Sequence, residues 1–207
     1  MLDCKCDSTV LTTIPDNCVL EFLKDGKWIF QKLDDDNNKF VDGVNGIELE
    51  SSWAGLPDAV DDTKVVITPI LEEVDYPEPD ILEDSENLDG APIRVASGPQ
   101  TVSAIVRLPT PEQYEAIMEL GCEKNLTVYQ VDNKGKFRAR EVATGEYAGL
   151  IISPDTFIVT SPFKSGNTRV DQLKLRITMT FPDGWYADAA VIEPEAGFNP
   201  LTDIAPS

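Results

Sequence analysis

The sequence contains no histidine in its 207 residues. Without an imidazole, neither a Ser-His-Asp triad nor a Cys-His pair can be built, and no zinc or iron site can use a histidine ligand. Catalysis would have to rest on carboxylates, lysine, tyrosine or cysteine alone. We therefore expect a protein that is not an enzyme and that has no catalytic residues and no cofactor.

Long apolar runs are also missing. No stretch approaches the roughly 18 residues that are needed to cross a bilayer. The first residues, Met1–Asp7, lack the basic-then-apolar layout of a secretory signal. We expect no membrane partner and a cytoplasmic location, at least before any assembly step.

Cysteine is scarce, with four residues at Cys4, Cys6, Cys18 and Cys122. They could together supply thiolates to a metal ion, but the close C-x₂-C pairs that are typical of zinc sites are absent. The alternative is a set of reduced structural thiols in a reducing compartment. We favour the thiols and expect no metal site.

Positive charge is limited to 17 lysines and arginines against 37 acidic residues, for a formal net charge of −20. DNA carries one negative charge per ~1.7 Å of its axis, so such a surface repels it. The simplest role of this charge is solubility. A more specific role is a surface that nucleic acid passes without binding.

Two segments bear a superficial likeness to binding motifs. Residues 34–39 resemble the start of a calcium loop, but Lys39 and Asn45 occupy the positions where an EF-hand has glycine and glutamate. Lys136, Arg138 and Arg140 alternate along one strand, which is too thin a stripe for a nucleic-acid surface. We expect neither an EF-hand nor a DNA-binding face, and interpret the stripe as a solvated face or one that meets an acidic loop of a neighbouring copy.

Strand patterns dominate the rest of the chain. Leu173, Leu175 and Ile177 begin a strict alternation with polar residues that continues to Phe181, as in a strand with one buried face. Asp25-Gly26 predicts a hairpin turn, and Pro69 confines the strand before it to a strand end or an edge. The predicted strands are 18–23, 27–33, 46–51, 64–68, 92–108 with a break at Gly98-Pro99, 126–131, 136–142, 147–152, 156–161 and 172–181. Strands 126–131 and 136–142 are predicted to form a hairpin with its turn at 132–135.

One helix is predicted over residues 110–121. Thr110 suits the N-cap, Pro111 the first helical position and Gln113 the closing position of a capping box. Tyr114, Ile117 and Met118 fall on one face at helical spacing, and Gly121 suits the end of the helix. We expect this face to pack against a sheet.

Residues 72–89 contain many acidic residues, no basic residue, and the helix-breaking Pro77 and Pro79. Like charges at this density repel one another, so the segment is predicted to be an extended, solvated loop that orders within an assembly.

We therefore expect a mainly β fold, an antiparallel sandwich or barrel with one short flanking helix and long loops. The predicted organisation is an N-terminal arm (1–17), a single β-sandwich-like domain (18–192) that includes the acidic loop 72–89, and an acidic, irregular C-terminal tail (193–207).

Several short segments together resemble tail tube (major tail) proteins of tailed bacteriophages and prophages. They are Cys4-Lys5-Cys6, Asn17-Cys18, Trp28–Lys32, Glu50–Trp53, Asp61–Pro69, Cys122–Tyr129 and Phe198–Leu201. The acidic segment 72–89 departs from the family, in which this region is richer in glycine, so no detail of that loop is carried over.

The resemblance implies a structural virion protein whose copies form stacked, hexameric rings in the tail, after assembly in the host cytoplasm. Long hairpins and the N-terminal arm would reach the next ring. Its partners would be copies of itself and other tail proteins such as the tape measure and the terminator. Viral DNA would slide through an acidic lumen without specific binding.

Two other classes of function remain open. Within the virion, the chain could be a head-tail connector, a tail terminator or a capsid decoration protein. Outside it, a carbohydrate-binding sandwich could use Trp28, Trp53 or Trp185 as a sugar platform, although we expect each tryptophan to lie in the core.

Overall fold

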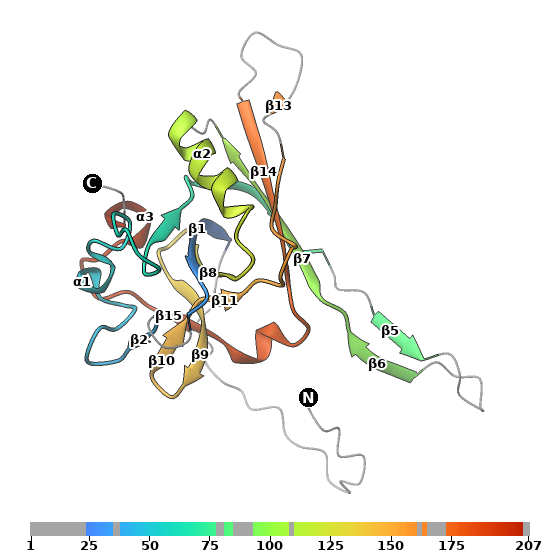
Figure 1. Cartoon of the computed structure of the whole chain (residues 1–207). Helices are drawn as coiled ribbons and strands as arrows, with labels where there is room; N and C mark the ends of the chain where they lie inside the picture. The colour runs from blue at the N-terminus through green and yellow to red at the C-terminus, as the bar shows by residue number, and fades with distance from the viewer. Residues whose placement is uncertain are drawn as a thin grey trace, which may run out of the picture.

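The computed structural model describes residues 24–34, 38–77, 81–84, 93–107, 110–160, 163–164 and 173–204. The expected N-terminal arm and the strand predicted at 18–23 lie outside this part of the chain. The described residues form two large antiparallel sheets packed face to face, a small two-stranded sheet, and one helix of more than one turn (Figure 1). The prediction of a mainly β fold with a short flanking helix is confirmed.

The larger sheet has eight strands, and its main order is β2-β10-β9-β8-β1-β3, with β11 paired to β8 and β15 to β9. The strands are β1 (Asp25–Lys32), β2 (Phe40–Val41), β3 (Val65–Ile67), β8 (Leu126–Asp132), β9 (Phe137–Ala143), β10 (Glu146–Ala148), β11 (Leu150–Ile151) and β15 (Ala189–Ile192). As predicted, β3 lies at an edge and β8 and β9 form a hairpin.

The smaller sheet has five strands in the order β12-β14-β7-β4, with β13 also paired to β14. The strands are β4 (Leu71–Asp75), β7 (Gln100–Arg107), β12 (Ile158–Val159), β13 (Phe163–Lys164) and β14 (Leu173–Phe181). In the long β7–β14 pair, Ile177 lies opposite Ala104 and Met179 opposite Val102, so apolar side chains share one face.

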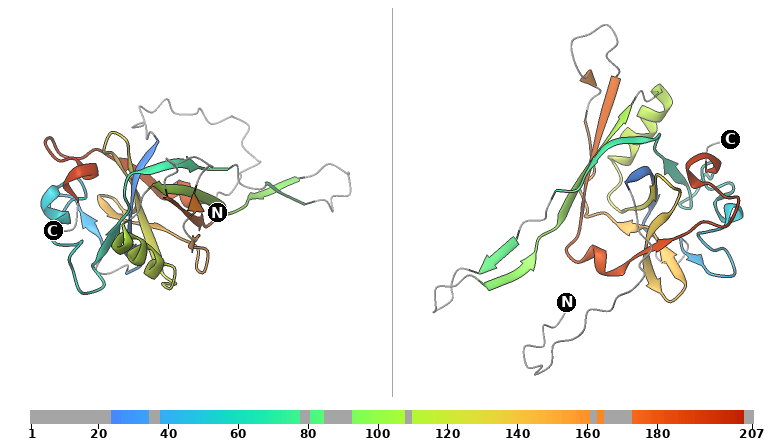
Figure 2. Two further views of the ribbon diagram at one scale, coloured as in Figure 1. Left: turned by 90° about the horizontal axis from the view of Figure 1, so that it is seen from above. Right: turned by 180° about the vertical axis from the view of Figure 1, so that it is seen from behind.

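A third, two-stranded sheet consists of β5 (Ile81–Asp84) and β6 (Ile93–Ser97). It follows β4 and precedes β7, and it projects well away from the sandwich (Figures 1 and 2). Residues 72–75 and 81–84 of the expected acidic loop are therefore strands. Cross-strand pairing with β7 and β6 outweighs the charge repulsion that predicted a loop.

The helix α2 (Pro111–Leu120) has the predicted capping box, in which Gln113 N donates to Thr110 Oγ1 and Thr110 N donates to Gln113 Oε1. Ile117 is buried and Tyr114 packs against the same core, as predicted, whereas Met118 is exposed and Leu120 is buried in its place, so the buried face is turned slightly from the predicted one. The other helical segments are the single turns α1 (Glu50–Trp53), η1 (Trp185–Asp188) and α3 (Pro200–Asp203). No described helix is long and apolar enough to cross a membrane.

The first core lies between the two sheets and beneath α2. Its buried side chains include Trp28 and Phe30 of β1, Val102 of β7, and Ile177 and Met179 of β14. Phe30 meets Phe157 edge to face, with ring centroids 5.1 Å apart.

The second core lies on the opposite face of the eight-stranded sheet. Trp53 of α1 stacks on Phe40 and on Phe137, with centroid separations of 4.6 and 5.2 Å. Phe198 and Ile204, from the segment expected to be an irregular tail, are buried in this cluster. The C-terminal segment up to residue 204 is thus part of the body.

Two local predictions are wrong. Asp25 and Gly26 are not a turn but the start of β1, where the register with β8 shifts between Asp25 and Lys27. The strand predicted at 46–51 is replaced by turns that lead into α1. Ile47 in that segment and Trp53 just after it pack onto the eight-stranded sheet as part of a covering loop, so their apolar character reflects burial rather than strand pairing.

Candidate assembly surface

The outer face of the five-stranded sheet carries short hydroxyl side chains. Thr180 lies opposite Thr101 and Thr178 opposite Ser103, and the Thr101 and Thr180 hydroxyl oxygens are 3.0 Å apart. Ile158 of β12 extends the same row beside Thr178 and leaves 56% of its surface exposed. These residues alternate with the core residues of the same strands, so they point away from the sandwich.

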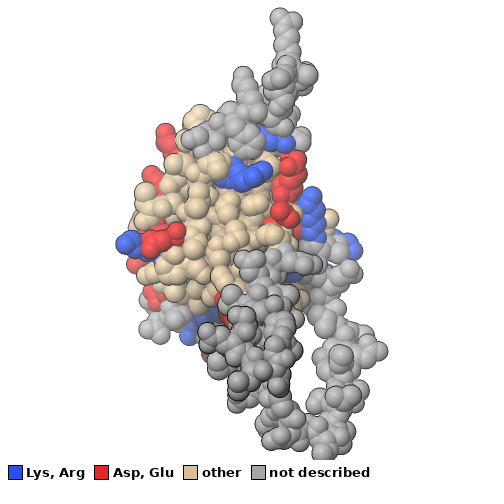
Figure 3. Space-filling model, turned by 90° about the vertical axis from the view of Figure 1, so that its right-hand side faces the viewer, with Lys and Arg blue, Asp and Glu red and all other residues tan. Residues whose placement is uncertain are grey.

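Charged residues lie mainly towards the margins of this face (Figure 3). Lys174 Nζ lies 3.6 Å from Glu73 Oε1 and 3.9 Å from Glu72 Oε2, so the neighbouring strand β4 supplies carboxylates to this lysine. Arg176, next to Thr178 on the same outward face of β14, is exposed, so the uncharged part of this face is the end that carries Thr178, Thr180, Thr101 and Ser103. Its chemistry suits contact with another protein surface better than an ionic ligand.

Both edges of this sheet end in strands that pair on one side only within the described part of the chain. β4 pairs with β7, and β12 pairs with β14. A strand edge of this kind presents backbone N–H and C=O groups that another strand can engage. β4 is acidic, with Glu72, Glu73 and Asp75, whereas β12 is apolar. The two edges therefore differ in chemistry.

A buried polar cluster lies where β1 meets the end of β4. Asp25 Oδ2 accepts a hydrogen bond from Trp28 Nε1 at 2.8 Å and a short one from the Tyr76 hydroxyl. Gln130 Nε2 donates to the Tyr76 oxygen at 2.7 Å, and Arg138 Nη1 donates to Gln130 Oε1 at 3.3 Å. The cluster thus connects three strands of the large sheet to the root of the projecting hairpin.

The environment of this cluster shifts two ionisation equilibria. Burial raises the pKa of the Asp25 carboxyl, against the effect of the Tyr76 and Trp28 hydrogen bonds, which lower it. Burial also raises the pKa of the Tyr76 hydroxyl well above its usual range, and the nearby Asp25 charge raises it further. The raised pKa favours the protonated Tyr76 hydroxyl, which is the form that donates to Asp25.

The basic stripe on β9 is only partly available to a partner. Lys136 Nζ lies 3.0 Å from Glu193 Oε1, and Arg138 lies over the Tyr186 ring at 5.9 Å from its centroid. Arg138 also belongs to the cluster described above. The interpretation of Lys136, Arg138 and Arg140 as a strand face for the acidic loop of another copy gains no support from these contacts.

The predicted metal and calcium candidates are not brought together. Cys4, Cys6 and Cys18 lie outside the described residues, and Cys122 is a free, exposed thiol. The segment that resembles a calcium loop is preceded by β1 and followed by β2, whereas an EF-hand requires helices there. Among the residues that the structure describes, no group of three or more acidic or cysteine side chains could hold a metal ion.

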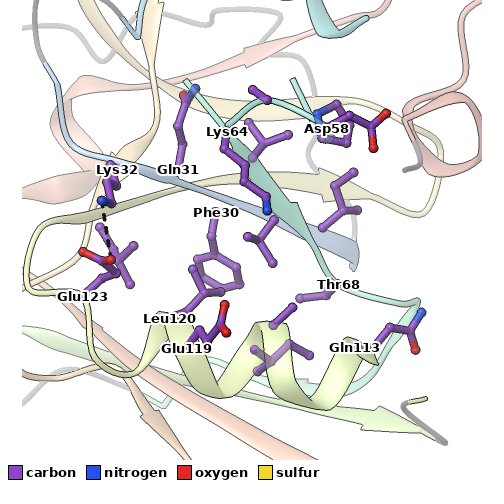
Figure 4. Close-up of a pocket in the computed structure, with 18 of the residues that line it drawn as sticks. Phe30, Gln31, Lys32, Asp58, Lys64, Thr68, Gln113, Glu119, Leu120 and Glu123 are labelled. Atoms are coloured by element: carbon purple, nitrogen blue, oxygen red, sulfur yellow. Dashed lines mark ion pairs between the residues drawn. The ribbon is translucent and has the colours of Figure 1, made fainter. Parts of the chain in front are cut away.

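A cleft of about 740 Å³ lies between α2 and the edge formed by β1 and β3 (Figure 4). Lys64 points into the space above Phe30, and Lys32 forms an ion pair with Glu123 at 3.5 Å at one end. The floor residues Phe30 and Leu120 belong to the core between the sheets. This cleft is therefore the packing boundary between α2 and the edge of the large sheet.

The tryptophans do not form an exposed platform. Trp28 and Trp53 are buried, and Trp185 is half-buried, stacked on Phe181 at a centroid distance of 4.5 Å. A sugar-binding surface requires exposed aromatic faces, so this geometry disfavours the carbohydrate-binding alternative.

Comparison with family models, with curated proteins and with solved structures found no match for this chain.

Proposed function

We propose that this chain is a structural virion protein, a tail tube subunit of a tailed bacteriophage. The observation that carries the proposal is the five-stranded sheet, whose outer face, here called the bare face, lies at the surface, and whose edge strands β4 and β12 each pair on one side only among the residues that the structure describes. A sheet of this kind is a template for pairing with another copy of the chain.

The unlike edges determine the kind of assembly. Pairing of β4 of one copy with the β12 side of the next would be heterologous, because the two surfaces differ. A heterologous contact repeated between copies closes into a ring when the rotation permits and otherwise continues as a filament. The family resemblance implies hexameric rings that stack into a tube.

In such a ring, the bare face of the small sheet would line one side of the wall, and the β5–β6 hairpin would extend towards another copy. If the bare face lined the lumen, DNA would meet mainly hydroxyl groups there. Lys174, the lysine beside those groups, already lies against Glu72 and Glu73. Arg176, exposed on the same face of β14, would be the cation most open to the phosphates, so such a wall would offer few cations and weak binding at most.

Negative-stain electron microscopy with mass photometry over a range of concentrations tests the proposal. We expect rings, stacked rings or tubes. Single rings that never stack would instead indicate a connector or terminator. Monomers at every concentration, with or without purified tail tips as a template, would contradict the tube proposal and leave binding to capsids as the test for a decoration protein.

A matched pair of variants tests the edge. Ile158→Lys places a charge on the exposed face of β12, and Val142→Lys makes the same change at an exposed position of β9 in the other sheet. We expect the Ile158 variant to remain folded and to lose assembly, and the Val142 variant to assemble like the wild type. Equal assembly of the two variants would show that the exposed face of β12 is not part of the interface between copies.

A further inference from the structure

The outer edge of β3 is open at one position within the described part of the chain. Thr68 N donates to Trp28 O at 2.9 Å, so the even-numbered residues of β3 bond to β1 and the odd-numbered ones face outward. Of these, Val65 uses its N–H to donate to Leu56 O at 3.1 Å. Among the described residues, none bonds to the outward N–H and C=O groups of Ile67. Ile67 is therefore the position at which another strand can pair.

The cleft beside α2 gives access to this edge. Its lining includes the consecutive residues Val65, Val66 and Ile67, whose side chains point alternately to the two faces of the sheet. It also includes Ile117, from the core beneath α2, and Ile204, from the core on the opposite face. The cleft thus runs around the edge of β3, and its volume of about 740 Å³ leaves room for side chains of an added strand.

A lysine lies on each face of this edge. Lys64 points into the space above Phe30, which is opposite Val66 in the register (Figure 4). Lys27 also lines the cleft, and the same register places it opposite Pro69, on the other face. Neither lysine has a carboxylate of the described residues within ion-pair distance. Burial lowers the pKa of the Lys27 ammonium, as expected for a charge that loses water without gaining a partner.

Several carboxylates that line the cleft are already engaged. Asp62 Oδ1 and Glu123 Oε1 lie 3.3 and 3.5 Å from Lys32 Nζ. Asp61 accepts hydrogen bonds from the backbone N–H and the hydroxyl of Thr63. The remaining acidic residues of the lining are exposed: Asp58, Glu112 and Glu119. Lys64 and Lys27 are thus the charges beside the open edge that a carboxylate from a partner would neutralise.

We propose that this edge is a docking site for an extended segment of a partner protein, which adds to β3 as an antiparallel strand and carries two acidic residues three positions apart. The segment's residue opposite Ile67 exchanges two backbone hydrogen bonds with it. The acidic residues lie opposite Val66 and Pro69 and reach Lys64 and Lys27, because side chains three positions apart in a strand point to opposite faces. This inference concerns the edge of the large sheet and does not depend on the proposed assembly.

Fluorescence anisotropy of a labelled peptide tests the site on the full-length chain. The probe is an amidated peptide, Thr-Glu-Ile-Val-Glu-Thr, in which the glutamates have the required spacing and the valine lies opposite Ile67. We expect saturable binding that weakens as the salt concentration rises. A peptide with glutamine in place of both glutamates should bind about tenfold more weakly, as expected for the loss of two ion pairs. Equal or tighter binding of the glutamine peptide would overturn the proposal.

Methylation of the peptide backbone tests the strand pairing. N-methylation of the valine removes the N–H that faces the Ile67 carbonyl, whereas N-methylation of the neighbouring isoleucine removes one that faces away from β3. We expect the first change to abolish binding and the second to preserve it. The same effect from both changes would show that the peptide does not add to β3 as an antiparallel strand.

Matched lysine variants locate the site on the protein. Lys64→Gln and Lys27→Gln should each weaken peptide binding about three- to fivefold. Lys134→Gln, in the exposed turn between β8 and β9, should leave it unchanged. Equal weakening in all three variants would indicate attraction by overall charge and would overturn the proposal. Binding that occurs only when assembled copies dissociate would make a second copy the occupant and would also contradict it.

Discussion

The two sheets of this protein differ in how many of their faces are covered. Every residue of β8 in the large sheet is buried, because one face meets the small sheet and the other meets α1, α3 and their connecting loops. β14 in the small sheet alternates instead, with Leu175 and Ile177 buried and Arg176 exposed. The large sheet thus has a packed core on each face, whereas the small sheet has a core on one face and solvent on the other.

This difference assigns different tasks to the two sheets. A sheet covered on both faces contributes stability and has little surface left for partners. A sheet with one bare face and open edges contributes less core but retains a surface that only another molecule can cover. Substitutions should therefore affect folding when they fall in the large sheet and assembly when they fall on the outer face of the small one.

The largest expected effect is in the second core. Trp53→Ala removes a ring stacked between Phe40 and Phe137, together with its hydrogen bond to the Ile47 carbonyl. We expect the free energy of unfolding to fall by about 3–5 kcal/mol, as for other buried aromatic truncations. Urea titration followed by circular dichroism measures it. Ile158→Ala on the bare face is the control and should change stability by less than about 0.5 kcal/mol.

The next effect is expected at the cluster between the sheets. Asp25→Ala leaves Trp28 Nε1 and the Tyr76 hydroxyl without their acceptor in a buried site. This should cost about 1–3 kcal/mol of unfolding free energy. Ser103→Ala removes a polar group from the outer face of the small sheet and should have almost no effect in the same titration. A similar loss in both variants would contradict the contrast between the sheets.

The same carboxylate should make stability depend on pH. Its pKa is raised in the folded state, so the folded chain binds this proton more readily than the unfolded chain does. The resulting stabilisation is fully present below the unfolded pKa of 3.8 and is lost as pH rises through the raised folded pKa. Asp25→Asn keeps an acceptor without titrating. The stability difference between wild type and this variant should therefore shift against the wild type as pH rises, and a flat difference would refute the assignment.

A smaller effect is expected at the helix that flanks both sheets. Thr110→Ala removes the hydroxyl that accepts from Gln113 N at 3.2 Å. We expect a loss of about 1 kcal/mol, which is usual for an N-cap. Thr144→Ala, in an exposed turn between β9 and β10, is the matched control. Thermal unfolding should distinguish the two, and equal melting temperatures would show that the cap is dispensable.

The smallest effect is expected on the bare face. Thr180→Val keeps the branched shape that suits a strand and removes one hydroxyl of the Thr101–Thr180 pair. Unfolding free energy should change by less than about 0.5 kcal/mol. A larger fall in the unfolding free energy of the dilute, monomeric protein would mean that this face is packed within the chain. It would contradict the distinction between a sheet covered on both faces and a sheet covered on one.

Much of the fold was predictable because local rules govern it. The alternation in β14, the turn between β8 and β9 and the capping box of α2 all act over a few residues, and each prediction is confirmed. The segment 46–51 failed for the opposite reason. Its apolar residue Ile47 is buried in the same cluster as Phe137, far along the chain, and no local pattern distinguishes such a covering loop from a strand.

The candidate site was less predictable. The period-two pattern of β14 predicted which of its faces would be buried, but not that the large sheet and α2 would cover that face. Asp25 and Tyr76 are 51 positions apart, and neither has a neighbour in sequence that marks it as a partner of the other. Their contact depends on the crossing of the chain from β3 in one sheet to β4 in the other.

By itself, the amino-acid sequence determined the secondary structure where short-range patterning was strong, the acidic charge, and the absence of every histidine-dependent chemistry. Tertiary structure alone decided that one sheet is covered on both faces and the other on one, that an acidic segment pairs as strands, and that the buried Asp25 carboxylate of the large sheet meets Tyr76 at the end of β4. The physical reason is that periodicity encodes which side chains share a face, whereas what covers that face depends on contacts between residues distant in the chain.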